Sequence, residues 1–178
     1  MCQETGHPGH GDPSVTKDVP GPDIAHAAIV AKINITDDRA DVMPDGRRLH
    51  MPEWTIVGQE DRIAPALGNR ERDHIRREVE KHFVPGATRV TVDVFVLDGT
   101  QTYKVGERVE RVTATFSLRI EIANHADIHD VRIGVGTALC NEESLDFTPD
   151  KVDEIYFRTI SESIHRAFEQ IASNSTHH

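Results

Sequence analysis

The apolar stripe along residues 149–171 constrains the fold more than any other feature of this sequence. Its members recur at the spacing of one helix face: Val152, Ile155, Tyr156, Ile160, Ile164, Phe168 and Ile171. Thr148 precedes the stripe as a suitable N-cap, and Pro149 suits the first helical position because it has no N–H to leave unpaired. A stripe of this length has to be buried. The sequence therefore predicts a closing helix over 149–171, packed on a large apolar surface.

Three segments that precede this helix supply that surface, because each alternates apolar and polar residues with a period of two. The alternation is strongest over 108–122 and is also present in 90–97 and 131–140. Such alternation is typical of strands with one buried and one wet face. Sequential neighbours with short loops favour an antiparallel meander. A further strand is predicted at 29–35 and a short one at 54–57.

A first helix is predicted over 69–83, where Ile75, Val79 and Phe83 recur every four residues before Pro85 and Gly86. The fold class is therefore α+β, with an antiparallel sheet of about four strands and two helices packed on one face. Residues 1–22 form a Pro/Gly-rich tether, 23–172 a single domain and 173–178 a polar tail. The tether and the tail are expected to be disordered.

Composition excludes several classes of function. The 178 residues carry a net charge of −10, which argues against nucleic-acid binding through bulk charge. The chain has two cysteines, Cys2 in the tether and Cys140 in a predicted strand. These positions predict no intrachain disulfide, and Cys140 is expected to be a small buried hydrophobe rather than a nucleophile.

Motifs for catalysis and cofactor binding are absent from the sequence. It contains neither a Gly-x-Ser-x-Gly elbow nor a glycine-rich phosphate loop. Gly134 and Gly136 lie inside a strand pattern, which indicates a bulge or the close approach of a helix. We therefore expect no cofactor and no enzymatic activity.

Two groups of residues are nevertheless candidate sites. His125, Asp127 and His129 share one loop and could bind a metal, although a solvated polar loop is the favoured explanation of them. The long segment 36–62 lacks clear periodicity and holds the single Trp, as ligand-binding segments often do. Its candidate ligand-binding residues are Asp38, Asp41, His50, Glu53 and Trp54.

Cys2 followed by the tether resembles the mature start of a bacterial outer-membrane lipoprotein. The order of elements over 25–172 is similar to the lipopolysaccharide-assembly lipoprotein family and to YajG-type lipoproteins. The shared elements are the strands near 29–35, 90–97, 108–122 and 131–140 and the helices near 70–83 and 149–171. This resemblance implies lipidation of Cys2, since stable anchoring needs acyl chains at that residue. It also implies a partner, an envelope protein or glycolipid, that meets a strand edge or a sheet face.

The sequence-based hypothesis is thus a lipid-anchored periplasmic binding or scaffold module of the bacterial envelope. A homo-oligomer is also compatible with the pattern, through pairing at an open sheet edge. The alternative is a cytoplasmic α+β ligand binder or enzyme with a site around residues 36–62.

Overall fold

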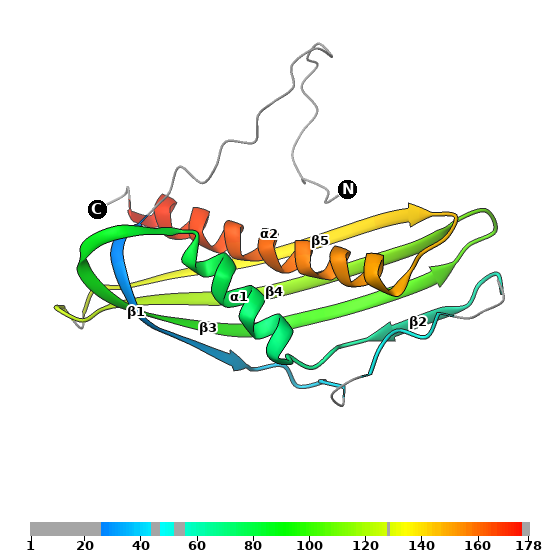
Figure 1. Cartoon of the computed structure of the whole chain (residues 1–178), viewed down its shortest axis with the longest axis horizontal. Coiled ribbons are helices and arrows are strands. Elements are labelled where there is room, and N and C mark those ends of the chain that lie inside the picture. Colours follow the sequence, from blue (N-terminus) through cyan, green and yellow to red (C-terminus); the bar gives the residue numbers. More distant parts are fainter. Residues whose placement is uncertain (1–25, 44–46, 52–55, 128, 176–178) are drawn as a thin grey trace, which may run out of the picture.

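The computed structural model describes residues 26–43, 47–51, 56–127 and 129–175. Within these residues, two helices cover one face of a five-stranded sheet (Figure 1). The elements in chain order are β1 (His26–Asp37), β2 (Glu60–Ile63), α1 (Asn69–Glu80), β3 (Phe83–Val105), β4 (Glu110–Asn124), β5 (Val131–Ser144) and α2 (Pro149–Ser175). The α+β class is confirmed. The predicted tether lies outside the described residues, and α2 continues three residues into the predicted tail.

The sheet is mixed rather than purely antiparallel. The strand order is β1-β3-β4-β5, and β2 pairs with the far end of β3. The meander of β3, β4 and β5 is antiparallel, as predicted. β1, however, runs parallel to β3. The chain between them passes through α1, which carries it back to the end of the sheet where β1 began.

β3 is much longer than its predicted span of 90–97. It covers 23 residues, and a register shift between Val96 and Asp98 interrupts its pairing with β4. Its early start also shortens α1, which ends at Glu80, so that Phe83 opens the strand. The predicted strand at 54–57 falls largely outside the described residues. The short strand of this region is β2, which pairs with residues 101–104 of β3.

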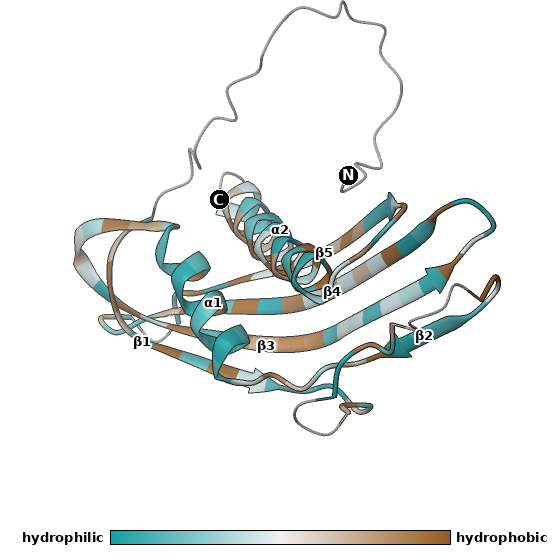
Figure 2. Cartoon of the chain, turned by 45° about the vertical axis from the view of Figure 1, so that its right-hand side comes forward, coloured by the Kyte–Doolittle hydropathy of each residue, from teal (hydrophilic) through white to brown (hydrophobic). Residues whose placement is uncertain are grey.

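α2 lies along β4 and β5 with its apolar stripe toward the sheet (Figure 2). The N-cap is confirmed, because the backbone N–H of Lys151 donates to Thr148 Oγ1 at 3.3 Å. The two glycines of β5 let the helix approach closely. A Cβ at Gly134 would collide with the backbone oxygen of Ala167, and one at Gly136 with that of Ser163. The close approach indicated by the sequence is therefore confirmed.

The opposite face of the sheet is not covered by either helix. On β5 it exposes a row of aliphatic side chains, each 44–47% accessible: Val131, Ile133, Val135 and Leu139. The free edge of the same strand is partly closed by α2. There, the Gln170 side chain accepts a hydrogen bond from the Val135 N–H, and Arg166 Nη1 donates to the Thr137 carbonyl at 3.1 Å. These side chains protect the middle of the edge from pairing.

Candidate binding site

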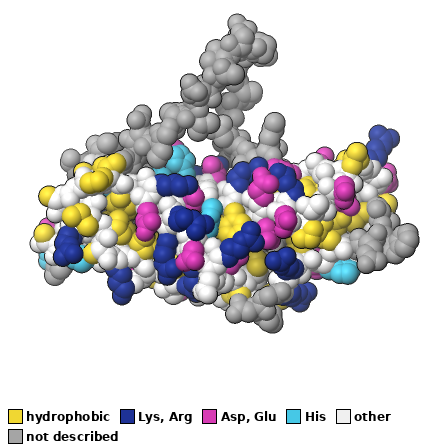
Figure 3. Space-filling model, in the orientation of Figure 1, with side chains coloured by type: hydrophobic (Ala, Val, Ile, Leu, Met, Phe, Trp, Pro, Cys, Tyr) yellow, Lys and Arg dark blue, Asp and Glu magenta, His cyan; other side chains and the backbone are white. Residues whose placement is uncertain are grey.

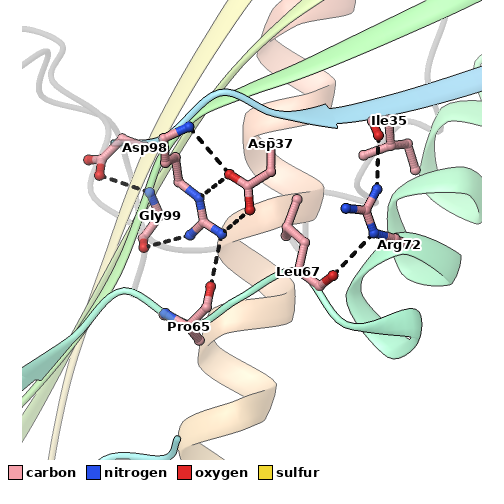
Figure 4. A network of polar contacts seen from close by, with 8 residues as sticks. Ile35, Asp37, Pro65, Leu67, Arg72, Asp98 and Gly99 are labelled. Atoms are coloured by element: carbon pink, nitrogen blue, oxygen red, sulfur yellow. Dashed lines mark hydrogen bonds and ion pairs between the residues drawn. The ribbon is translucent and has the colours of Figure 1, made fainter. Parts of the chain in front are cut away.

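A buried arginine closes the junction between β1 and β2 (Figure 4). Arg39 follows β1, and its side chain is only 4% exposed. Its Nε and Nη2 atoms each lie 2.7 Å from a carboxylate oxygen of Asp37. The same guanidinium donates to the carbonyls of Gly99 at 3.1 Å and Pro65 at 2.9 Å. Arg39 therefore joins the end of β1, the register shift of β3 and the segment before α1.

A second arginine performs a similar task at the start of α1. Arg72 Nη1 donates to the Ile35 carbonyl on β1 at 2.8 Å, and its Nε donates to the Leu67 carbonyl at 3.1 Å (Figure 4). Planar guanidinium groups suit such bridges because their donors point in several fixed directions. The two arginines hold the segment 64–68 against the sheet.

The charge of Asp37 depends on this network. Burial alone would raise the pKa of Asp37, but the hydrogen bonds and the charge of Arg39 outweigh burial and lower that pKa. The carboxylate is therefore ionised at neutral pH and fixes the guanidinium in place.

Beside this junction lies a cavity of about 220 Å³, which we call the α2 cavity. Its walls come from the first two turns of α2, the start of α1 and two connecting segments. They include Leu49, Ala66, Gln101, Val152, Tyr156 and Phe157. Its volume is below the roughly 300–1,000 Å³ of pockets that enclose drug-sized ligands. It therefore suits a small molecule or one end of a larger one.

Two buried polar side chains line the α2 cavity. Gln101 is 5% exposed and occupies a core-facing position of β3, yet its amide makes no hydrogen bond to a described residue. Tyr156 is 3% exposed, and the Arg39 guanidinium lies near its hydroxyl oxygen, but its O–H donates to no acceptor in the described part of the chain. Burial raises the pKa of Tyr156, so the phenol stays protonated and able to donate. Unpaired buried groups cost folding free energy, which favours a further partner for them.

Some charged residues of the α2 cavity form ion pairs with described residues and others do not. Arg70 Nη1 lies 2.7 Å from Asp153 Oδ2, and its guanidinium sits 4.6 Å from the centre of the Phe157 ring. By contrast, Arg48 makes no ion pair within the described residues, and Arg47 contacts only the Met43 sulfur, at 3.7 Å. Figure 3 shows basic and acidic side chains interleaved over the helical face of the molecule.

The candidate residues of segment 36–62 are dispersed rather than gathered. Asp38 follows β1, and its N–H donates to the Val96 carbonyl. His50 is exposed, and its N–H donates to Asp61 Oδ2 at 2.6 Å. Asp41 lines a second cavity of about 470 Å³ near the end of β1. Glu53 and Trp54 lie outside the described residues. The segment does reach the α2 cavity, but through its neighbouring residues 47–49 and Met51.

The histidines of the loop between β4 and β5 make local contacts. His125 Nε2 lies 2.7 Å from Thr91 Oγ1. The carboxylate of Asp127 accepts the His129 N–H at 3.0 Å. Among the residues that the structure describes, no group of three His, Cys, Asp or Glu side chains is arranged to hold a metal ion.

The structure tests the prediction for only one of the two cysteines. Cys2 lies outside the described residues. Cys140 is fully buried and disulfide-bonded, contrary to the sequence-based expectation. The described residues contain no other cysteine, so the second thiol of that bond lies outside them. Acylation of Cys2 and a bond between Cys2 and Cys140 exclude each other chemically.

Sequence reasoning missed Arg39, Arg48, Gln101 and Tyr156. One signal was available, because Gln101 is a polar residue at a core-facing position of a β pattern. Tyr156 was assigned to the apolar stripe, and its unpaired hydroxyl became evident only in three dimensions.

Comparison with known proteins identifies no family for this chain. No protein-family model matches the sequence, and no curated protein matches it. Among solved structures, the chain is similar to protein XCC0632 from Xanthomonas campestris, assigned to the family model DUF330. The TM-score is 0.44 at 12% identity, over 92% of this chain and 94% of that one. No helix in the described part of the chain is long and apolar enough to span a membrane.

Proposed function

We propose that this protein is a binding module of the bacterial cell envelope whose ligand occupies the α2 cavity, and that a form in which Cys140 is not disulfide-bonded is held at a membrane by lipid on Cys2. One observation carries the proposal. The cavity is lined by Tyr156, whose buried O–H donates to no described acceptor, and by Gln101, whose amide makes no hydrogen bond to a described residue. A ligand that supplied partners for these two groups would offset their desolvation.

The charged groups of the cavity support binding more than catalysis. Asp153 is already paired with Arg70, and Glu71 lies in the first turn of α1, where it complements the helix dipole. Both carboxylates therefore have electrostatic partners in the protein.

A second candidate function keeps the cavity and omits the anchor. Segment 36–62 contributes Leu49 and Met51 to the cavity wall, which favours a small-ligand binder whatever its compartment. The two candidates differ only in the chemistry of Cys2.

The test is expression from the natural gene, with its own leader, in cells fed an acyl-chain label. We expect label on the peptide that begins at Cys2, recovery of the protein in the membrane fraction, and loss of both in Cys2→Ser. Mass spectrometry of the same peptide also detects the alternative, a disulfide between Cys2 and Cys140. Unlabelled soluble protein, or a peptide joining Cys2 to Cys140, would contradict the anchor and leave the second candidate.

A further inference from the structure

The cavity also indicates the chemistry of its ligand, an inference that rests on the proposed binding function. We infer that the α2 cavity binds a small amphipathic anion, an apolar chain that ends in a carboxylate or phosphate. Three independent features of the described residues support this: a group of apolar side chains in the wall, an excess of exposed cations without carboxylate partners, and buried polar donors.

Apolar side chains from different elements form one part of the cavity wall. Val152 and Phe157 come from α2, Pro65 and Ala66 from the segment before α1, and Leu49 from the segment that follows residue 46. Val152 is buried, at 4% exposure. An alkyl chain placed among these groups would leave water for a hydrocarbon environment, which is favourable in proportion to the area covered.

The charges at the mouth favour an anion over a cation. The cavity is lined by Arg47, Arg48 and Arg70 against Glu71 and Asp153. Arg70 and Asp153 neutralise each other. Glu71 lies at the N-terminal turn of α1, whose partial positive charge it offsets.

Two guanidinium groups, those of Arg47 and Arg48, therefore remain without a carboxylate partner among the described residues. Guanidinium groups bind carboxylate and phosphate through paired hydrogen bonds.

Two further features strengthen the preference. The cavity includes Pro149, the first residue of the 27-residue helix α2, whose N-terminal end carries partial positive charge. At the floor, the Gln101 amide and the protonated Tyr156 phenol both contain N–H or O–H donors without partners in the described chain. An acidic oxygen atom would accept from these donors. The oxygen atoms of the same two side chains could also accept from an ammonium group, so the preference for an anion depends on Arg47 and Arg48.

The experiment compares probes that share one alkyl chain and differ only in the head group. Octanoate, 1-octanol and octyltrimethylammonium are titrated into the full-length protein, and binding is followed by calorimetry and by chemical shifts of backbone amides. We expect saturable binding of octanoate, binding of 1-octanol at least about ten times weaker, and none for the cation. Octanoate affinity should fall with rising salt, while that of 1-octanol should not.

Variants locate the site and assign the charge preference. Arg48→Gln should weaken octanoate binding about 3- to 5-fold and leave 1-octanol unchanged. Arg77→Gln, an exposed arginine on the far turn of α1, is the matched control and should change neither affinity. Ala66→Phe fills the cavity from a loop and should abolish binding of both probes. Leu49→Trp repeats this from the opposite wall in case the first variant unfolds.

The source of the ligand is separated by one more comparison. Octyl phosphate in solution and anionic phospholipid vesicles present the same chemistry as a free metabolite and as a membrane lipid. Binding of either at the cavity, blocked by Ala66→Phe, supports the inference. Equal affinity for octanoate and 1-octanol, or octanoate binding that survives both filled-cavity variants, would overturn it. That outcome leaves the acylation test of Cys2 unaffected, so the two failures are distinguishable.

Discussion

Arg39 Nη1 donates to the Gly99 carbonyl at 3.1 Å, and this hydrogen bond lies in the interval of β3 between its pairing with β1 and its pairing with β2. β1 pairs with β3 as far as Val96, and β2 begins its pairing at Gln101. The register shift of β3 lies between these points. A side chain thus supplies the donor that a neighbouring strand would have supplied.

Replacing Arg39 should therefore destabilise the fold strongly. Arg39→Ala leaves the Asp37 carboxylate and two carbonyls without their donor in a buried place, where a broken ion pair costs about 3–5 kcal/mol. Arg39→Lys should fall between the variant and the wild type, because an ammonium group cannot reach all three acceptors. Urea denaturation measures both.

An exposed arginine provides the matched control. Arg111 pairs with Glu143 across β4 and β5, with side chains 51% and 48% exposed. Arg111→Ala should lower the free energy of unfolding by less than about 1 kcal/mol. Equal losses for Arg39→Ala and Arg111→Ala would show that the junction is not held by its guanidinium.

A buried histidine makes stability depend on pH. His82 is 6% exposed, and its ring stacks on Phe168 with centroids 4.1 Å apart. Burial, followed by the nearby His165 and His26, lowers the pKa of His82 to about 4, against weaker opposition from Glu78. Lys81 lowers the pKa slightly further.

In the unfolded chain, His82 takes up a proton near pH 6.5, whereas in the folded chain it does so only near pH 4. Stability is therefore complete above pH 6.5 and falls as the pH drops toward 4, by up to about 3 kcal/mol. Thermal unfolding at a series of pH values measures this slope. His82→Phe keeps the stacked ring and should flatten the slope, whereas His129→Gln in the exposed loop should not.

Because α2 contacts β5 closely, adding a single methyl group at this contact should lower the free energy of unfolding strongly. Gly136→Ala would place its Cβ against the backbone of Ser163, which cannot move without shifting the helix. Overpacking of this kind costs about 1–3 kcal/mol, and we expect the upper end. Val135→Ala, on the open face of the same strand, should cost about 1 kcal/mol or less. Chemical denaturation that found the reverse order would contradict the close approach.

Periodicity predicted the elements whose burial is regular. The stripe of α2 and the alternation of β4 could be recognised because each repeats one environment at a fixed spacing. The direction of β1 could not be predicted, because residues buried on one face alternate in the same way in parallel and antiparallel strand pairs. β2 could not either, since Glu60–Ile63 contains a single apolar residue and is a strand only because β3 offers it a partner.

The site was harder to predict for a related reason. The α2 cavity joins residues from four separate parts of the chain, and no local pattern records that they meet. His50 and Trp54 were chosen as polar or aromatic residues in an irregular segment, which identifies a region rather than a geometry. Gln101 is the exception, as a polar residue out of place in a buried alternation.

The effect of replacing Gln101 on stability can be compared with the effect of replacing Gln170. Gln101→Met replaces an amide that makes no hydrogen bond to a described residue, so it should change the free energy of unfolding by less than about 0.5 kcal/mol. Gln170→Met makes the same change on α2, where the side chain accepts the Val135 N–H, and should lower stability by about 1 kcal/mol. The urea midpoints of both variants measure these two changes in stability. If Gln101→Met were as destabilising as Gln170→Met, the Gln101 amide would have to be hydrogen-bonded within the free protein and would not be available to a ligand.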